Sequence, residues 1–320
     1  MARKNLLRNC VATLAVVHSA LSYAQEFPSK PLFIQHGLAA GGQTDISIRV
    51  LADALSRKLN VPVVVQAKPG AAQAIAVAGV AKANPDGYTI GHFYQGAFST
   101  VPLLQEVSYT LDDLSPIIAW QLSPQVLAVR SDSPLKNLAD LVAAAKANPE
   151  IPFGHQGKGS VTFMAPTVFA KEAGIRLNGI QYKGDADTAA ALLGGHIPTA
   201  SITEVAAGPL LESGKIRVLV TYAKVRSPNF PEIPTFEDQG FKVPIQVPVG
   251  ILFAPKNTPA PVMKKLHDSV REVIQDEKTK KEFATMKQVL YYMDSKSVRD
   301  LIDNERKTYY PILKDAGLTK

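Results

Sequence analysis

Hydrophobic positions in the first third of the chain follow a strand–helix–strand pattern. The apolar run 32–34 is β-like, and after a loop of small residues apolar positions recur at helical spacing from 46 to 59. A continuous β-branched run over 61–65 is typical of a strand buried on both faces. An alanine-rich helix over 71–83 and a strand over 88–90 complete the series. Alternation of this kind predicts parallel βαβ units with right-handed crossovers.

The same alternation recurs from Pro124 onward. The sequence predicts strands over 126–129, near 152–154, near 180–182, near 200–202 and over 216–221, with helices over 133–147, after Ser160 to Gly174, over 188–193 and over 209–212. A proline-rich loop over 227–248, a strand over 250–253 and helices over 259–275, 278–286 and 295–314 close the chain. Two α/β series predict two lobes with a ligand cleft between them. We expect residues 25–123 and 248–320 in lobe 1 and residues 124–247 in lobe 2.

Residues 1–24 have the pattern of a secretory signal peptide. A basic start precedes an apolar stretch over 11–17 and a small-residue cleavage site at 22–24. Its removal takes away three positive charges and no acids, so the formal net charge falls from +7 to +4. The only cysteine, Cys10, lies inside it, which leaves the mature chain without a disulfide or a cysteine metal site. No later apolar run approaches the roughly 18 residues that span a bilayer, so we expect an exported, soluble protein.

Two turns rich in glycine lie before predicted helices. The first is the stretch 37–45, at whose end Thr44 or Asp45 is expected to cap the helix, and the second is 157–160. A small-residue turn before a helix offers free backbone N–H groups and the positive end of the helix dipole to an anion. One such turn is a weak signal, because glycine connectors are common. Two of them, one in each lobe, predict a clamp on a single anionic ligand.

Several other classes of site find no support. The first turn lacks the lysine of a P-loop and the G-x-G-x-x-G spacing of a dinucleotide fold. No histidines are spaced for a metal site, and no G-x-S-x-G elbow is present. His36, His92 and His155 each follow or end a predicted strand, so they either converge on the cleft or are partly buried and bond to backbone. Lysines on the late helices alternate with acids, as on solvated faces rather than a nucleic-acid surface.

A set of short motifs occurs in one order along the chain. These are Phe27–Pro31, Ala40–Asp45, Pro62–Val65, Asn84–Thr89, Gly157–Ser160, Tyr182–Gly184, Leu192–Gly195, Ser213–Arg217 and Phe253–Pro255. In this combination the chain closely resembles the Bug family, the periplasmic solute-binding proteins of tripartite tricarboxylate transporters. The resemblance covers essentially the whole mature chain.

The resemblance implies a type II periplasmic-binding-protein fold whose two α/β lobes close on a ligand by hinge motion. It further implies that a small carboxylate is held by the first glycine turn and by the helix start of the second lobe, partly through waters. Carried over from the family to this chain, the residues that contact the carboxylate are 40–44 and 157–160. Residues 182–186 and 94–98 would form further walls of the binding site. It implies a periplasmic, monomeric protein that works with membrane permease subunits and needs no cofactor, metal or nucleic acid.

The sequence departs from the family pattern at several positions. Members commonly have Pro-Phe-Pro where this chain has residues 36–38, a histidine at the position of Phe163, an aromatic before the glycine of the returning strand near Pro248, and a small residue at Asp185. We therefore hypothesise a carboxylate with a bulkier or aromatic body, such as a benzene mono- or dicarboxylate, packed on Phe163. A polar group at its far end would be met by His36, His155 or Asp185. The predicted ligand-binding residues are His36, Ala40, Gly41, Gly42, Gln43, Thr44, Tyr94, His155, Gly157, Lys158, Gly159, Ser160, Phe163, Tyr182, Asp185 and Ser201.

The sequence thus favours a receptor that binds a carboxylate and presents it to a membrane transporter. Two alternatives stay open at this stage. One is a ligand-sensing subunit of a signalling system, which would use the same pocket. The other is a small exported enzyme with His36 or Asp45 as its base. Nothing in the sequence demands catalysis, so we predict a binding protein and no enzyme.

Overall fold

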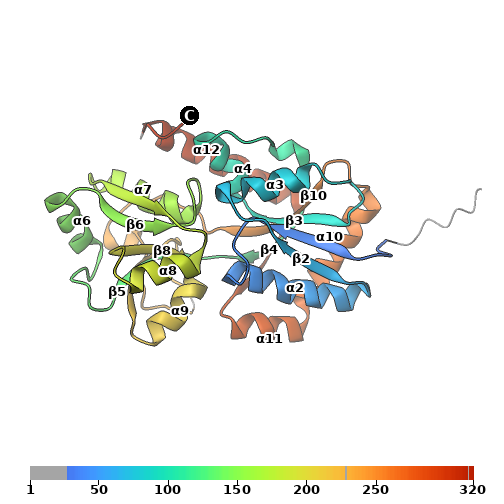
Figure 1. Ribbon diagram of the computed structural model, residues 1–320, viewed down its shortest axis with the longest axis horizontal. Helices are drawn as coiled ribbons and strands as arrows, with labels where there is room; N and C mark the ends of the chain where they lie inside the picture. The colour runs from blue at the N-terminus through green and yellow to red at the C-terminus, as the bar shows by residue number, and fades with distance from the viewer. Residues whose placement is uncertain (1–26, 228, 316) are drawn as a thin grey trace, which may run out of the picture.

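A computed structural model describes residues 27–320 except 228 and 316. The predicted signal peptide lies outside the described residues. Two α/β lobes lie side by side, each built on its own sheet (Figure 1). This confirms the predicted fold class. In the part of the chain described, no helix combines the length and the apolar character needed to cross a bilayer.

The first lobe contains a six-stranded sheet in the order β11-β4-β10-β3-β1-β2. Its strands are β1 (Leu32–His36), β2 (Val63–Ala67), β3 (Thr89–Tyr94), β4 (Leu114–Leu122), β10 (Val249–Pro255) and β11 (Val289–Met293). The first three strands run parallel, as predicted, whereas β10 is antiparallel to β3 and β4. One face packs on α2 (Gln43–Leu59), α10 (Ala260–Gln275) and α11 (Glu277–Thr285), and the other on α3 (Ala74–Ala81) and α4 (Gly96–Ser99).

The second lobe contains a five-stranded sheet in the order β7-β6-β8-β5-β9. Its strands are β5 (Gln125–Arg130), β6 (Ile151–His155), β7 (Leu177–Gln181), β8 (Thr199–Thr203) and β9 (Ile216–Thr221). Helices α6 (Leu138–Ala147) and α7 (Val161–Glu172) cover one face, and α8 (Asp185–Leu193) and α9 (Glu204–Glu212) cover the other. The glycine turn 157–160 therefore joins β6 to α7 at the carboxyl end of a parallel strand.

The chain crosses between the lobes where β4 leads into β5 and where the loop before β10 returns. The two crossing segments are joined by a hydrogen bond from Ser123 N to Pro248 O (2.8 Å). The last helix, α12 (Ser295–Asp315), is a third connection (Figure 1). Its first half packs in the core of the first lobe through Val298 and Ile302, and its second half packs in the core of the second lobe through Tyr309 and Leu313.

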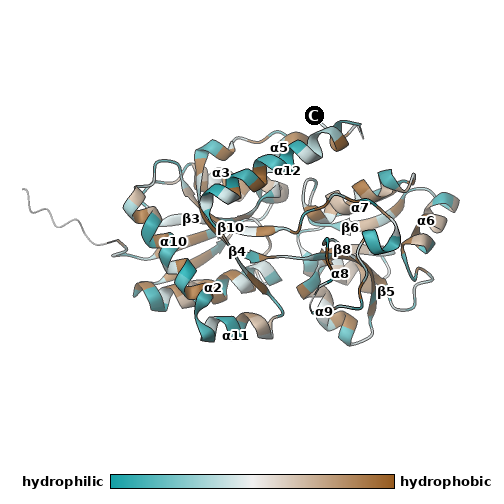
Figure 2. Cartoon of the chain, turned by 180° about the vertical axis from the view of Figure 1, so that it is seen from behind, coloured by the Kyte–Doolittle hydropathy of each residue, from teal (hydrophilic) through white to brown (hydrophobic). Residues whose placement is uncertain are grey.

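Hydrophobic residues concentrate on the strands, while α12 alternates hydrophilic and hydrophobic residues along its length (Figure 2). That alternation fits a helix with one buried face. Trp120 is fully buried in the core of the first lobe.

Four local expectations were wrong. Helix α2 begins at Gln43 with Gly42 as its N-cap, so neither Thr44 nor Asp45 caps it. Strand β2 was expected to be buried on both faces, but Val64 is 40% exposed. It is an edge strand, because it pairs with β1 on one side and with no other strand of the described residues on the other. The predicted helix over 71–83 starts only at Ala74, after a left-handed stretch. Strands β4 and β11 and the short helices α4 and α5 (Val101–Leu104) were not predicted.

Candidate functional site

A cavity lies between the two lobes, where loops from both sheets meet. We call it the inner cavity. Its polar lining comprises Thr44, Gln73, Tyr94 and Gln95 from the first lobe and Gln125, Gln156, Ser160, Thr162 and Thr203 from the second. The aliphatic Leu38, Val101 and Val161 line it as well. Among the described residues, no side chain that lines this cavity carries a formal charge.

Two outer crevices adjoin the inner cavity. One lies between the turn 38–44 and the start of α8, at 184–187. The other lies between 69–72 and the segment that carries Tyr182, Lys183 and His196. Leu38 and Gln156 line all three spaces, so these two side chains stand between the inner cavity and the outside.

The lobes are closed on each other around the inner cavity. Thr100 Oγ1 of the first lobe donates a hydrogen bond to Gly159 O of the second at 2.5 Å. A Cβ atom at Gly159 would lie 3.0 Å from Val101 Cα, and one at Gly157 would lie 3.1 Å from Ala72 Cβ. The second glycine turn is therefore needed for the close approach of the lobes as well as for its backbone conformation, since both glycines have positive φ.

Helix starts supply the positive potential that the side chains do not. The α7 helix begins at the inner cavity with Ser160 as its N-cap, and the first turn of α2 reaches that cavity through Thr44, while its N-cap Gly42 lines an outer crevice. The Ser160 hydroxyl donates to Gly157 O (2.7 Å) and lies 2.7 Å from Thr162 Oγ1, so it does not cap its own helix. First-turn N–H groups and the helix dipole are thus left for an anion. The first turn of α7 has no acidic residue, whereas that of α8 carries Asp185 and Asp187.

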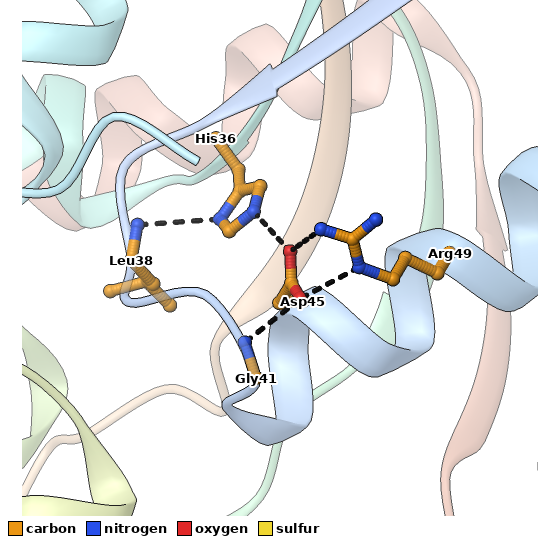
Figure 3. Close-up of polar contacts among 5 residues, drawn as sticks. All are labelled: His36, Leu38, Gly41, Asp45 and Arg49. Atoms are coloured by element: carbon orange, nitrogen blue, oxygen red, sulfur yellow. Dashed lines mark hydrogen bonds and ion pairs between the residues drawn. The ribbon is translucent and has the colours of Figure 1, made fainter. Parts of the chain in front are cut away.

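Asp45 holds the first glycine turn in place (Figure 3). Its carboxylate accepts hydrogen bonds from Gly41 N (2.9 Å) and Arg49 Nε (2.8 Å), and His36 Nε2 lies 2.8 Å away. Leu38 N donates to His36 Nδ1, which leaves the ring proton on Nε2 for Asp45. Burial would raise the pKa of Asp45, but hydrogen bonds from Arg49, Gly41 and His36 outweigh it and hold that pKa below its usual value. Arg49 balances the Asp45 charge at the start of α2.

His36 is therefore a support for the turn and not a wall of the cavity. Its side chain is 1% exposed and lines none of the three spaces. Burial lowers its pKa, although the neighbouring Asp45 opposes the shift, so a neutral imidazole is favoured. The prediction that His36 meets the far end of the ligand is not supported by its position.

Asp185 organises two cavity residues. Its carboxylate accepts hydrogen bonds from Gln156 Nε2 (2.5 Å), Thr203 N (3.0 Å) and Thr203 Oγ1 (2.8 Å). Burial raises the pKa of Asp185, and these bonds oppose that shift. Gln156 and Thr203 line the inner cavity, while Asp185 itself lines only an outer crevice. We interpret Asp185 as a residue that positions the amide and the hydroxyl, rather than as a direct ligand contact.

The helical phase of α7 explains where Phe163 lies. Ser160 and Thr162 line the inner cavity, whereas Phe163, the next residue on the helix, turns into the core and stacks on Phe153 with ring centroids 6.3 Å apart. The aromatic wall expected at Phe163 is thus absent from the described cavities. His155 is likewise buried, and its Nδ1 accepts the Gly157 N–H at 2.9 Å.

The other predicted residues divide into three groups. Thr44, Tyr94, Gly159 and Ser160 lie together at the inner cavity. Ala40, Gly41, Gly42 and Gln43 line one outer crevice and Tyr182 the other. Gly157, Lys158 and Ser201 line none of these spaces, and Ser201 Oγ lies 2.9 Å from the Tyr222 hydroxyl inside the second lobe.

The sequence did not lead us to Gln73, Gln125, Gln156 or Thr203, and Gln95 was named only as part of the wall 94–98. Gln95 and Gln156 each follow a strand directly, and Thr203 ends β8. Gln125 begins β5, which is antiparallel to β8, so it lies at the same sheet edge as Thr203. For all of these residues except Gln73, one signal was therefore available: polar residues at the strand ends that face the cleft.

The wall formed by 71–73 is strained. Ala71, Ala72 and Gln73 have φ values of 46°, 50° and 78°, in a region that non-glycine residues seldom adopt. Gly37 makes room for this stretch, because a Cβ there would lie 2.5 Å from Gln73 Cα. The space that a bulky residue at 37 would occupy is thus taken by Gln73, which lines the inner cavity. Strain of this kind is typical of ligand clamps.

We predict that Ala72→Gly raises the free energy of unfolding by about 0.5–1 kcal/mol, because relief of left-handed strain exceeds the added entropy of the unfolded chain. Urea denaturation measures the change. Ala78→Gly, in the middle of α3, is the matched control and should lower stability by about 1 kcal/mol. Equal destabilisation by both substitutions would contradict the left-handed conformation at 72.

Among the described residues, no group of three or more histidine, cysteine, aspartate or glutamate side chains is placed to hold a metal ion. The acceptors and donors at the inner cavity are amides, hydroxyls and backbone N–H groups. Such a site holds its ligand by hydrogen bonds and by the helix dipoles.

Comparisons with known proteins agree with this geometry. A family profile described as "Tripartite tricarboxylate transporter family receptor" matches residues 47–318. A UPF0065 protein of Cupriavidus necator, from the gbd 5' region, is 32% identical over 303 residues, which cover 94% of this chain and 92% of that protein. The solved periplasmic binding protein BugD is 28% identical with a TM-score of 0.85 and covers 92% of this chain and 100% of its own. The R. palustris protein Rpa4515, solved with adipate, has the same fold at 24% identity and a TM-score of 0.85, covering 92% of this chain and 99% of its own.

Proposed function

This chain belongs to the tripartite tricarboxylate transporter receptor family, and from that premise we propose that it captures a small carboxylate in the inner cavity and delivers it to the membrane components of such a transporter. Members of this family are periplasmic solute-binding receptors and not enzymes. The observation that carries the proposal is an uncharged, polar cavity between two lobes at which α7 begins and which the first turn of α2 reaches through Thr44. A carboxylate suits such a site because it gains charge-assisted hydrogen bonds from backbone N–H groups.

The carboxylate would lie between the two glycine turns. On the first lobe it would meet the start of α2 and the Thr44 hydroxyl, which lies 3.2 Å from the Tyr94 hydroxyl. On the second lobe it would meet the start of α7 and Ser160. Closure brings the two turns together, so the carboxylate meets its full set of donors only when both lobes are in place. The aliphatic lining at Leu38 and Val161 supports a ligand body that is at least partly apolar.

Closure requires bending at the crossing segments. We propose 25–123 with 248–320 and 124–247 as the two moving lobes, because the crossings at Ser123 and Pro248 coincide with these limits. The C-terminal half of α12 would be the exception, since it packs on the second lobe. A signal peptide over 1–24 would export the chain, and a monomer would suffice because the inner cavity is complete within one chain.

We predict that Thr44→Val weakens carboxylate binding about tenfold, the cost of roughly 1.4 kcal/mol for a lost hydrogen bond to a charged group. The lobe should stay folded, because the Thr44 hydroxyl contacts only Tyr94 among the described side chains. Thr167→Val, which removes a hydroxyl bonded to Phe163 O within α7, is the matched control. Calorimetry with the same acid on all three proteins measures the effect, and unchanged affinity for Thr44→Val would remove that residue from the site.

A thermal-shift screen tests the proposed function directly. Mono- and dicarboxylates, both aliphatic and aromatic, should raise the melting temperature, since ligand bound to the folded state stabilises it. Sugars and inorganic cations serve as controls and should not. Stabilisation by sugars or cations, with no response to any acid, would contradict the proposal.

A further inference from the structure

One acceptor at the inner cavity has no donor. Gln125 is 5% exposed and lines the cavity at the start of β5. Its Nε2 donates to Ser123 O at 3.0 Å and lies 3.2 Å from Ser123 Oγ. Because a backbone carbonyl only accepts, the orientation of the amide is determined, and Oε1 is the other branch. This Oε1 is buried and accepts a hydrogen bond from none of the described residues.

The neighbouring glutamine Gln95 differs in this respect. Its Oε1 accepts from Val249 N (2.7 Å) and its Nε2 donates to Val247 O (3.2 Å), so both ends of its amide are used by the crossing segment. The Nε2 group of Gln156 donates a hydrogen bond to Asp185. The Gln125 oxygen therefore stands out as a buried acceptor, on a side chain that lines the cavity, to which no described residue donates.

A buried acceptor without a donor costs about 1–3 kcal/mol. The cost disappears if the captured molecule brings a donor to that point. The floor of the cavity here is formed by the crossing segments, where Ser123 N donates to Pro248 O. A donor on the ligand would thus point toward the hinge, while its carboxylate faces the helix starts.

We propose that the ligand is a carboxylic acid with a hydrogen-bond donor, a hydroxyl or an amino group, beside its carboxylate, and that Gln125 Oε1 accepts from it. Gln125 is then a specificity-determining residue. This inference rests on the proposed function and narrows its substrate class. A site built to bond a hydroxyl or an N–H group discriminates strongly against the analogue that lacks it, because the protein acceptor is then left unpaired.

Matched acids test the inference on the wild-type protein. Two sets are titrated by calorimetry: succinate, malate and aspartate, and phenylacetate, mandelate and phenylglycine. In the set that fits the cavity, the hydroxy or amino member should bind at least about tenfold more tightly than the unsubstituted acid. Equal or tighter binding of the unsubstituted acid overturns the inference, and this comparison does not depend on any variant folding.

Gln125→Met removes the acceptor and keeps the length of the side chain. The preference for the substituted acid should fall to within about threefold, with no loss of affinity for the unsubstituted acid. Gln181→Met, the same change at an exposed residue of an outer crevice, should keep the wild-type preference. A preference that survives Gln125→Met overturns the assignment of Gln125.

If no acid of any kind binds, both this inference and the proposed function fail. If acids bind equally well with and without a donor, this inference alone fails and the proposed function stands.

Discussion

Gly159→Ala is expected to weaken carboxylate binding about 30-fold, equivalent to roughly 2 kcal/mol, while both lobes stay folded. A Cβ at this position would lie 2.9 Å from Val101 Cγ2 and 3.0 Å from Val101 Cα. The second contact is to backbone, which cannot turn aside, so the lobes must stay further apart. The hydrogen bond from Thr100 to Gly159 O would then lengthen or break. The apparent affinity for the ligand falls in proportion to the fraction of protein molecules that can reach the closed state.

Gly174→Ala is the matched control for this prediction. Gly174 also has positive φ (+64°), but a Cβ there meets no atom within 4 Å. Both variants therefore carry the backbone cost of alanine in the left-handed region, and only Gly159→Ala obstructs closure. Calorimetry gives the affinities, and thermal unfolding gives the stabilities. Equal affinities for the two variants would show that the contact between the lobes at Gly159 is not needed for binding.

Glu305→Gln is expected to raise the free energy of unfolding by about 3 kcal/mol at pH 8 and by little at pH 4. Glu305 is fully buried on α12 where the helix passes from one lobe to the other. It accepts hydrogen bonds from Ser99 Oγ (2.5 Å) and Gln95 Nε2 (3.5 Å), and Tyr309 lies one turn further along the helix. A glutamine can keep this arrangement, because its amide oxygen accepts from Gln95 and its NH₂ group can donate to Ser99.

The direction of the pH dependence follows from burial. Burial raises the pKa of Glu305 from 4.5 to about 7, against the opposing effect of the bonds from Ser99 and Gln95. Between pH 4.5 and 7 the folded state keeps a proton that the unfolded state releases, so wild-type stability from this group falls as the pH rises. Above about pH 7 the loss is complete, and the glutamine variant avoids it.

Urea denaturation at pH 4, 6 and 8 measures this effect on both proteins. The difference between Glu305→Gln and the wild type should grow across that range. Glu232→Gln, at an exposed position, is the control and should show no such growth. A constant difference between Glu305→Gln and the wild type at all three values would contradict a buried carboxyl that titrates near neutrality.

The strongly periodic elements could be predicted from sequence, and the irregular ones could not. Strand β9 and helix α10 were found almost at their observed limits, because β-branched runs and helical spacing are direct consequences of burial. Strand β4 contains a Ser-Pro step and is buried along nearly its whole length, so it shows no alternation that would mark it. Strand β11 is only half-buried, and the four-residue helices α4 and α5 are too short for a period to appear.

Of the residues that line the candidate cavity, Thr44, Tyr94, Gly159 and Ser160 were named from the sequence, and most of the glutamines were not. The two glycine turns were identified because glycine before a helix has a direct backbone meaning. Phe163 was misplaced because its orientation depends on the phase of α7, which the sequence leaves open by about one residue. The glutamines at 125 and 156 were missed because an isolated glutamine is an ordinary surface residue, and only the convergence of strand ends gives it a role. Gln73 was missed because the left-handed stretch that places it has no signal in the sequence.

Mass spectrometry of the small molecules released when the purified protein is denatured is the most direct test of the central claim. The account predicts a carboxylic acid at up to one equivalent per chain, recovered unchanged after prolonged incubation with the protein. Release of a sugar, a nucleotide or a metal ion as the bound species, or conversion of the acid into another compound during incubation, would contradict it.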